Sequence, residues 1–451
     1  MFLYSPFRHD SRVTREALAL VAAGHEVRVI AAHDAGTEAH ERREGFEIVR
    51  VARDPLPTRL VRRLLAHRRP APEPEEAGPA VAERPVGLVL AERVLAVRRA
   101  PNASPAGRLA ARALELGLGA HIALEHRRWH RNALRAAAAE PADVWIAHDL
   151  ETLATADRAR SRHGGALVYD SHELFLERDT ILPLRSRARR ALARRERRLI
   201  RRADAVVTVS ESIAAELARR YEVPRPSVVL NVPSRPRQGA ETAAPDLRDA
   251  LGVPPERGIA LYLGGIQEQR PLDHLVRAAA RLERAVMVLM GPAEPSYRAA
   301  LERVAEQAGA TGNLRFAPAV DPELVVAVAA GADVGVVPFR RTSMNQYLAL
   351  PNKVFEYIAA GLPVVGSDFP EIGRVIEEHG IGLTFDPDDE GSIAAAIDRL
   401  LADPAERARM RERTRAAAEV LSWEREEPKY LRIVEGAAGL SERRTTARPR
   451  R

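Results

Sequence analysis

Short apolar runs rich in β-branched residues alternate along most of this chain with segments rich in Ala, Leu and Arg. Runs of this kind are typical of strands buried on both faces of a parallel sheet, and the segments between them are typical of covering helices. We therefore predict an α/β protein. The predicted strands are residues 2–4, 27–31, 47–50, 144–147, 167–169 and 205–208, and then 259–263, 286–290, 314–316, 334–337 and 363–366.

Two segments interrupt this alternation. Residues 67–105 are dense in Pro, Ala and charge, which predicts a mobile insertion in a first domain at 1–232. Residues 233–255 are predicted to be a linker to a second domain at 256–410. Open α/β sheets bind ligands outside the carboxyl ends of their strands, so we expect a two-domain enzyme with its site between the domains. Helices are predicted at residues 12–23, 106–139, 186–202, 211–220, 272–282, 297–309, 351–360 and 392–402.

Composition excludes several classes of protein. The chain has 451 residues and no Cys, which removes disulfide scaffolds, Cys-based zinc sites and thiol nucleophiles. It has no run of about 18 apolar residues that would predict a membrane-spanning helix. The first residues lack the pattern of a signal peptide, so we expect a cytoplasmic protein.

The charge of the chain is basic, with 69 Lys and Arg against 62 Asp and Glu and a net charge of +7. Only Lys353 and Lys429 are lysines, which indicates an Arg-rich, GC-rich coding genome. The high charge is therefore weak support for nucleic-acid binding. The aromatic fraction of 4% also offers few platforms on which bases could stack. We expect no nucleic-acid partner.

The stretch from 349 to 376, ALPNKVFEYIAAGLPVVGSDFPEIGRVI, carries the most chemistry. Pro351 is predicted as the first residue of a helix, whose N-terminus offers N–H groups and a positive dipole end to an anion. Lys353, in the first turn, opposes the helix dipole, and a bound phosphate would offset this. Glu356, one turn beyond Asn352, could accept hydrogen bonds from two ribose hydroxyls.

This stretch resembles the C-terminal signature of the family 4 glycosyltransferases of the group 1 type. The resemblance covers nearly the whole chain and implies the GT-B fold, in which two Rossmann-like, doubly wound domains face each other across a cleft. It implies that 1–232 binds the acceptor, that 256–410 binds a nucleotide-sugar donor, and that 411–436 is a helix crossing back to the first domain. We expect 437–451 to be a disordered tail. The other similar segments are SRVTREALALVAAGHEVRVI, AHDLETL, YDSHELF, ADAVVTVSESIAAEL, LYLGGIQEQRPLDHLV and LSWEREEPKYL.

The resemblance places the donor contacts in the second domain. Glu356 matches the second of the family's two glutamates, which holds the ribose. The first falls on Leu348, so its role is either vacant or taken by another group such as Asn345. The family's diphosphate-binding Arg and Lys fall on Gly265 and Arg270, so we expect Lys353 to supply the missing charge. The predicted diphosphate-binding residues are Gly264, Gly265, Arg270, Lys353 and Asn352, and the residues predicted for the donor sugar or its loop are Asn345 and Pro351.

The resemblance also places the family's active-site histidine at His172, after the strand at 167–169. His148, Asp149 and Glu173 are expected on the acceptor side. For Asp149 a second explanation is equally good, since it could simply cap the next helix.

We expect no metal and no other cofactor. Many metal-dependent glycosyltransferases use an Asp-x-Asp pair, but Asp386 and Asp388 lie between a short strand and a helix, where turn and capping roles are favoured. The negative charge that grows on the leaving diphosphate would then be stabilised by Arg270, Lys353 and the helix N-terminus.

Segments 185–202 and 59–69 are strongly basic. Two interpretations remain open: a peripheral contact with anionic lipid at the inner face of the membrane, or an ordinary solvated helix surface.

The resemblance therefore implies a retaining, hexosyltransferase-type glycosyltransferase that uses a UDP-, GDP- or related nucleotide sugar. Its acceptor is expected to be a glycan, a lipid-linked molecule or a small molecule, most plausibly in cell-envelope polysaccharide or glycolipid assembly. Two alternatives stay open, a nucleotide-sugar-binding protein without transfer activity and a sugar-nucleotide epimerase on the same fold.

Overall fold

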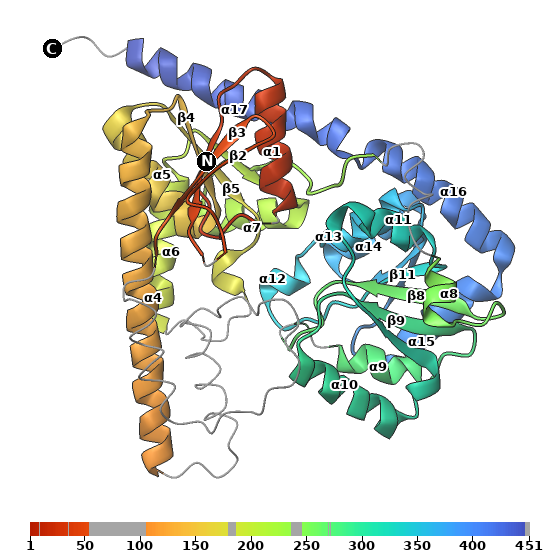
Figure 1. The fold of residues 1–451 in the computed structure, drawn as a ribbon. Coiled ribbons are helices and arrows are strands. Elements are labelled where there is room, and N and C mark those ends of the chain that lie inside the picture. Colours follow the sequence, from red (N-terminus) through yellow and green to blue (C-terminus); the bar gives the residue numbers. More distant parts are fainter. Residues whose placement is uncertain are drawn as a thin grey trace. The chain divides into compact units, whose positions relative to one another are not determined.

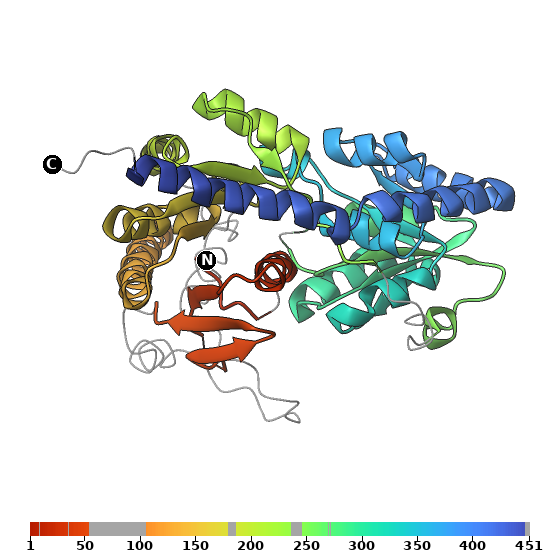
Figure 2. The same ribbon diagram turned by 90° about the horizontal axis from the view of Figure 1, so that it is seen from above.

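The structure is a computed structural model. It describes residues 1–8, 10–34, 36–53, 105–178, 186–235, 246–268, 270 and 272–446. The predicted insertion at 67–105 and the basic segment at 59–69 lie outside these residues, except for Pro105. The chain divides into two compact units, which are drawn in Figures 1 and 2. Unit 1 comprises Met1–His172, Thr180–Val207 and Leu431–Arg451, and unit 2 comprises Glu173–Asp179 and Thr208–Tyr430.

Unit 1 is built on a largely parallel sheet with the N-terminal segment at its centre. Phe2 bridges Ile30 on one side and Ala147 on the other, both in parallel. It thereby joins strands in the order β2-β3-β1 to strands in the order β4-β5-β6-β7. The strand predicted at 2–4 is thus a single bridge. The strands of unit 1 are β1 (Arg28–Ala32), β2 (His40–Arg43), β3 (Phe46–Val51), β4 (Val144–His148), β5 (Ala166–Ser171) and β6 (Ala205–Thr208), whereas β7 (Ser227–Val228) belongs to the residues of unit 2.

Two elements of unit 1 were not predicted. Strand β2 is short, charged and antiparallel to β3, so it lacks the apolar run of a buried strand. Helix α5 follows β4 directly and has few large apolar residues, because small side chains and threonines fill much of its buried face. The helices are α1 (Ser11–Ala22), α4 (Pro105–Ala139), α5 (Asp149–His163) and α6 (Ser186–Ile200).

Unit 2 contains a six-stranded parallel sheet in the order β10-β9-β8-β11-β12-β13. Alternate residues of β8 enter two separate cores. Ile259, Leu261 and Leu263 pack on one face, and Ala260 and Tyr262 on the other. The parallel α/β class predicted from the sequence is therefore confirmed. The strands are β8 (Gly258–Leu263), β9 (Ala285–Met290), β10 (Leu314–Ala317), β11 (Val334–Val337), β12 (Val364–Ser367) and β13 (Gly382–Phe385).

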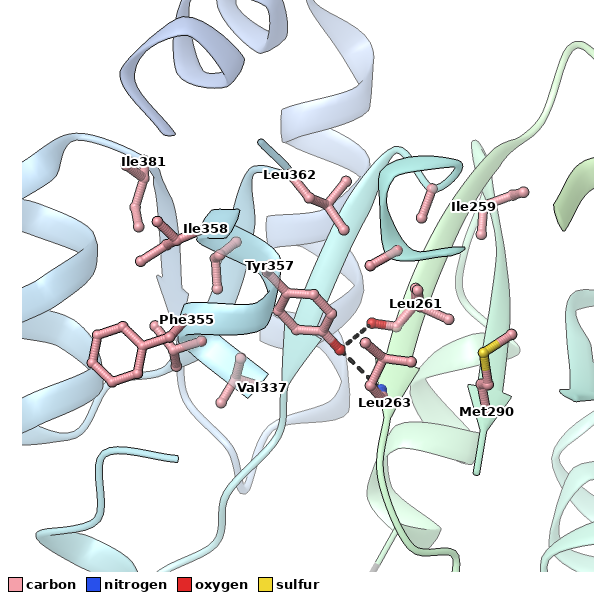
Figure 3. Close-up of a cluster of buried hydrophobic side chains, with 14 of the residues drawn as sticks. Ile259, Leu261, Leu263, Met290, Val337, Phe355, Tyr357, Ile358, Leu362 and Ile381 are labelled. Carbon is pink, nitrogen blue, oxygen red and sulfur yellow. Dashed lines mark hydrogen bonds between the residues drawn. The ribbon is translucent and has the colours of Figure 1, made fainter. Parts of the chain in front are cut away.

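Tyr357 fastens helix α13 (Asn352–Ala359) to the middle of this sheet (Figure 3). Its hydroxyl donates to Leu261 O at 2.8 Å and accepts from Leu263 N at 2.9 Å. Its ring lies against Gly335 of β11, where a Cβ would collide with it. The N-terminus of α13 is consequently held at a defined position beside the end of β8.

Short helices cover the rest of unit 2, and several were not predicted because they have fewer than about two turns. Part of the predicted linker at 233–255 is ordered: Leu247 and Val253 are buried in the core, and Asp246 caps a short helix. Residues 236–245 of that linker lie outside the described residues. The helical elements are η1 (Phe175–Glu177), α7 (Glu211–Tyr221), α8 (Leu247–Leu251), α9 (Asp273–Ala279), α10 (Pro295–Ala308), η3 (Thr311–Asn313), η4 (Pro322–Leu324), α11 (Val325–Ala330), α12 (Met344–Tyr347), α14 (Pro370–His379), α15 (Glu390–Ala402) and α16 (Pro404–Val420).

The last helix, α17 (Trp423–Thr446), begins in unit 2 and passes into unit 1 at Leu431. Residues 437–446 were predicted as part of a disordered tail, but they continue helix α17. Val434 and Ala437 of this helix are buried, which holds it in place where the predicted tail begins. Among the described residues, no helix combines the length and the apolar content that crossing a membrane requires.

Candidate functional site

The carboxyl end of β8 lies beside the first turn of α13 in unit 2. Strand β8 ends at Leu263, and the following Gly264 has a φ of +138°, which favours glycine. A Cβ on Gly264 would lie 2.9 Å from Arg270 Nη1 and 3.3 Å from Lys353 Nζ. Two cations therefore converge on this piece of backbone. We call Tyr262, Gly264, Arg270 and Lys353 the strand-end cluster.

Lys353 is the buried cation of the strand-end cluster, with 5% of its surface exposed. Its Nζ lies 3.8 Å from the centroid of the Tyr262 ring and 5.7 Å from that of Phe339, which favours an ammonium by cation–π attraction. Burial, and then the Arg270 guanidinium, lower the pKa of Lys353 well below its ordinary value, while Glu356 opposes this. Within the described ranges, no carboxylate forms an ion pair with Lys353 or Arg270. An anion bound here would relieve the repulsion between them.

The start of α13 holds three more of the predicted donor residues. Pro351 is the N-cap, so the helix begins one residue later than predicted, at Asn352. Asn352 Oδ1 accepts a hydrogen bond from Asn231 Nδ2 at 2.8 Å. Glu356 lies one turn further and is half-buried. Gly265, the remaining predicted diphosphate residue, accepts a hydrogen bond at its carbonyl oxygen from the Tyr262 hydroxyl at 3.2 Å.

A second group of ionisable side chains lies in unit 1, where β4, β5 and α1 meet. Arg12 donates to both oxygens of Asp170, from Nε at 2.9 Å and from Nη2 at 2.8 Å. Arg12 Nε also lies 2.9 Å from Glu16 Oε1. His172 Nε2 lies 3.0 Å from Asp170 Oδ2 and 3.2 Å from His148 Nδ1. We call Arg12, Glu16, His148, Asp170 and His172 the histidine cluster.

Burial and mutual contact set the charges of the histidine cluster. Burial alone would raise the pKa of Asp170, but Arg12 and His172 lower it well below its usual value. Burial opposes the charge of His172, but Asp149 and Asp170 raise its pKa to about 10. Burial lowers the pKa of His148, although the Asp170 carboxylate acts in the opposite direction and raises it. Burial, and then Asp170, raise the pKa of Glu16 to about 8, and Arg12 opposes this.

Asp149 orients His172 from the start of helix α5. Its φ of +61° is unusual for a residue with a side chain, and strained backbone of this kind gathers at functional sites. Its Oδ1 accepts from the His172 backbone N–H at 3.0 Å, and its Oδ2 lies 3.7 Å from His172 Nδ1. The sequence left open whether Asp149 caps this helix. The N-cap of α5 is His148, so Asp149 lies in the first turn and is not the cap.

Asn345 and Glu173, predicted for the donor and acceptor sides, contact each other within unit 2. Asn345 Nδ2 donates to Glu173 Oε2 at 2.9 Å, and its Oδ1 accepts from Leu174 N at 2.9 Å. Arg178 also donates to Glu173, at 3.0 Å. Asn345 therefore ties the segment that follows His172 to helix α12.

One set of described side chains meets the geometric requirement for a metal ion: donor atoms of His148, Asp170 and His172 lie within 4.8 Å of one another. The chemistry of this set does not fit a dication. Both Asp170 oxygens already accept from Arg12, and a metal would have to sit beside that guanidinium.

Asp386 and Asp388 lie in the turn after β13. Asp386 Oδ1 accepts from Asp388 N at 2.9 Å, Asp388 pairs with Arg340 at 2.9 Å, and Asp389 is the N-cap of α15. Asp386 therefore has the predicted turn role, while Asp388 forms an exposed ion pair that was not predicted and the capping is done by Asp389.

Four residues of the two clusters were missed by the sequence reasoning. Asp170 stands two positions before His172 at the end of β5, so the strand-end rule could have found it. Arg12 and Glu16 are one helical turn apart, but nothing in the sequence indicates that a charged pair is buried. Tyr262 looks like a core aromatic of β8.

Two family models match the chain. Residues 244–417 match the model described as "Glycosyl transferases group 1", and residues 89–231 match "Glycosyltransferase Family 4". A D-inositol 3-phosphate glycosyltransferase from Nocardioides sp. is 30% identical over 328 residues, which are 65% of this chain and 68% of the relative. The chain spans between 51% and 68% of the length of other curated relatives with the same name.

Solved structures resemble the whole chain at low identity. A sucrose-phosphate synthase from Thermosynechococcus elongatus matches 99% of this chain and 98% of its own, with a TM-score of 0.68 and 18% identity. The Anabaena protein HepE in complex with UDP-glucose matches 96% and 98%, with a TM-score of 0.62 and 14% identity. These likenesses bear on the fold alone, and they confirm the predicted GT-B architecture of two Rossmann-like domains.

Proposed function

Because this chain belongs to the family 4 glycosyltransferases of the group 1 type, we propose that it transfers a hexose from a nucleoside-diphosphate sugar with retention and without a metal. The observation that carries this proposal is the convergence of Arg270 and Lys353 on Gly264, with the N-terminus of α13 alongside. Fixed cations and oriented N–H groups are what a leaving diphosphate requires.

Each donor residue then has a defined task. Arg270 and Lys353 stabilise the growing charge on the diphosphate, and Gly264 and Gly265 let the backbone approach it closely. Glu356 accepts hydrogen bonds from the ribose hydroxyls. His172 contacts the sugar that is transferred. His148 lies 1% exposed and Glu173 is bound by Asn345 and Arg178, so both support the acceptor side through their neighbours.

Retention follows the pattern of the family. The acceptor hydroxyl attacks on the face that the nucleotide leaves, and the leaving phosphate accepts the acceptor's proton. Such a mechanism needs no pair of opposed carboxylates of the kind that glycosidases use. With Arg270 and Lys353 as the counter-charges, it also needs no metal.

UDP is the nucleotide that we propose first, since HepE resembles this chain and is described with UDP-glucose. For the acceptor we propose a hydroxyl of a glycan or glycolipid in cell-envelope assembly. An inositol phosphate, named in the curated relatives, is the small-molecule acceptor to compare with it.

Variants of Lys353 and Glu356 test the donor site. Lys353→Ala should lower kcat by roughly 100-fold, because the transition state loses one fixed cation, and Glu356→Ala should mainly raise KM. Lys353→Arg should also lose activity, since the buried position of Nζ near the rings of Tyr262 and Phe339 suits a compact ammonium. The thermal shift caused by UDP, GDP, ADP and TDP should fall in the same variants.

The matched control is Lys429→Ala, which removes the other lysine, a half-exposed side chain that pairs with the buried Glu426. It should leave turnover and the nucleotide shifts unchanged. Near-normal turnover by both Lys353→Ala and Glu356→Ala would overturn the donor-site assignment.

We also propose a peripheral contact of helix α6 with anionic lipid. Arginines 187, 189, 190, 194, 195 and 198 are exposed on this helix. Leu199 and Ile200 are 2% exposed and belong to the core, so the attraction would be electrostatic with no apolar insertion. Binding to vesicles containing phosphatidylserine should therefore vanish at high salt, and no binding at low salt would refute it.

A further inference from the structure

Asp170 is the fixed point of the histidine cluster. It lies at the end of β5, and Arg12 on α1 grips both of its oxygens; Arg12 is 2% exposed and Asp170 is fully buried. A bidentate pair of this kind fixes the orientation of the carboxylate as well as its position. Asp170 therefore remains an anion that cannot rotate away from its neighbours.

His172 is held between two carboxylates. Its Nε2 lies 3.0 Å from Asp170 Oδ2, and its Nδ1 lies 3.7 Å from Asp149 Oδ2. Its side chain keeps 20% of its surface exposed, so part of it remains open to solvent. A neutral imidazole has one N–H, whereas this position offers an acceptor oxygen near each ring nitrogen. The geometry matches an imidazolium.

The charges of the other groups that face His172 balance a positive charge on its ring. Arg12 is a cation, and Asp149 and Asp170 are anions. His148 is fully buried against Asp170 and Glu16, and burial lowers its pKa, so it is neutral. Burial raises the pKa of Glu16 to about 8, so Glu16 is mostly protonated at neutral pH.

One more acid, Asp10, acts on His148 from a greater distance and caps helix α1. With a protonated His172, the two cations of the cluster, Arg12 and His172, match the two anions, Asp149 and Asp170. A neutral His172 would leave a net negative charge in a nearly dry site, which is unfavourable.

We propose that Asp170, held by Arg12, is a positioning residue that keeps His172 protonated, so that His172 acts as a cationic hydrogen-bond donor and not as a general base. The part about His172 rests on the proposed function, which places it against the transferred sugar. The part about Asp170 and its hydrogen bonds does not.

The proposal leaves the chemistry of transfer balanced. The bond from the anomeric carbon to the phosphate oxygen breaks with its electron pair going to the phosphate, and the bond to the acceptor oxygen forms. The acceptor's proton passes to the leaving phosphate. His172 keeps both ring protons throughout. Its Nε2–H keeps its hydrogen bond to Asp170 Oδ2, whereas Nδ1, which lies 3.7 Å from Asp149 Oδ2, donates its hydrogen bond to a sugar hydroxyl or to developing negative charge.

The test is an NMR titration of the full chain with isotope-labelled histidine. His172→Gln identifies the signal, and His25→Gln, a change at an exposed histidine of the same unit, is the control that should leave that signal in place. The His172 ring should stay protonated from pH 6 to pH 9. A midpoint near that of an ordinary histidine, about 6.5, would overturn the proposal.

Two variants locate the cause. Asp170→Asn should lower the His172 midpoint strongly, but it leaves Arg12 buried without its partner and could unfold unit 1. Asp149→Asn removes the second carboxylate at a position that is 19% exposed and leaves the Arg12 pair intact. It should lower the midpoint as well. A midpoint unchanged in both folded variants would refute the role of these carboxylates.

The pH profile of activity separates this inference from the proposed function. The kcat/KM of the parent protein should show no alkaline decline from His172 below pH 9, while Asp149→Asn should lose roughly tenfold per pH unit above its lowered midpoint. If His172 is protonated but His172→Gln turns over normally, the proposed contact with the sugar fails and the charge assignment stands. If His172→Gln is inactive but the ring is neutral, the charge assignment fails and the proposed contact with the sugar stands.

One further arm excludes a metal. Zn²⁺ added to the protein should leave the His148 and His172 signals unchanged, because Arg12 occupies the carboxylate that a metal would need. Stoichiometric shifts of both signals, reversed by EDTA, would overturn the proposal in favour of a metal site.

Discussion

Glu16 is a fully buried carboxyl group that faces the charged Arg12 and Asp170 and the imidazole of His148. Its pKa, raised to about 8 from 4.5, means that the folded protein prefers the protonated acid. Stability from this preference is complete below pH 4.5 and is lost as the pH rises to about 8. A glutamine resembles the protonated form and has no charge to lose.

Glu16→Gln should therefore stabilise the protein at alkaline pH. We expect the gain over the parent chain to grow between pH 5 and pH 8 and to reach roughly 1 kcal/mol or more above it. Thermal unfolding midpoints at pH 5, 7 and 9 measure this. Glu302→Gln, at an exposed pair with Arg298, is the control and should show no such pH trend. A Glu16→Gln protein that is less stable at pH 9 would contradict the assignment.

At the scale of elements, the strand-end cluster depends on the contact between α13 and β8. Tyr357 makes this contact from the core, through Leu261 O and Leu263 N (Figure 3). Lys353 lies one helical turn before Tyr357, and Gly264 directly follows Leu263. The position of Lys353 relative to Gly264 thus depends on a hydroxyl that contacts neither residue.

Tyr357→Phe should lower the free energy of unfolding by about 1–3 kcal/mol, because the Leu263 N–H is left without its acceptor in a dry core. It should also weaken the thermal shift caused by UDP, since the start of α13 loses its anchor. Thr414→Val is the matched control: its buried hydroxyl donates to Met410 O within α16. The control should lose stability and keep the nucleotide response; equal losses of that response in both would refute the anchoring role.

At the scale of the whole molecule, the chain changes units after His172, Asp179, Val207 and Tyr430. Periodicity predicted most of the strands and long helices, because both depend on local patterns of apolar residues. It did not predict that residues 173–179 belong to unit 2. That assignment depends on contacts such as those of Asn345 with Glu173 and Leu174, which join positions about 170 apart in sequence.

The residues of the candidate site also differ in whether the sequence could predict them. Gly264 and Lys353 could be predicted, since they lie at a strand end and at a helix start, where chemistry gathers, whereas Arg270 was predicted from the family resemblance alone. The family resemblance predicted that these residues share one site. The structure adds the distances by which Arg270 and Lys353 approach Gly264. The buried charges around Asp170 were not predictable, because a helical Arg–Glu pair normally faces water.

The burial of Lys353 has a practical consequence for the reagents that react with this protein. An ammonium with a lowered pKa spends more of its time as a free amine, which is the form that acylating and Schiff-base-forming reagents attack. The whole sequence has only one other lysine, Lys429, which pairs with Glu426. The arginine-rich composition thus leaves two competing amines, Lys429 and the N-terminus of Met1, whose pKa burial lowers to about 5, and among the three Lys353 is the one that reports on whatever enters the strand-end cluster.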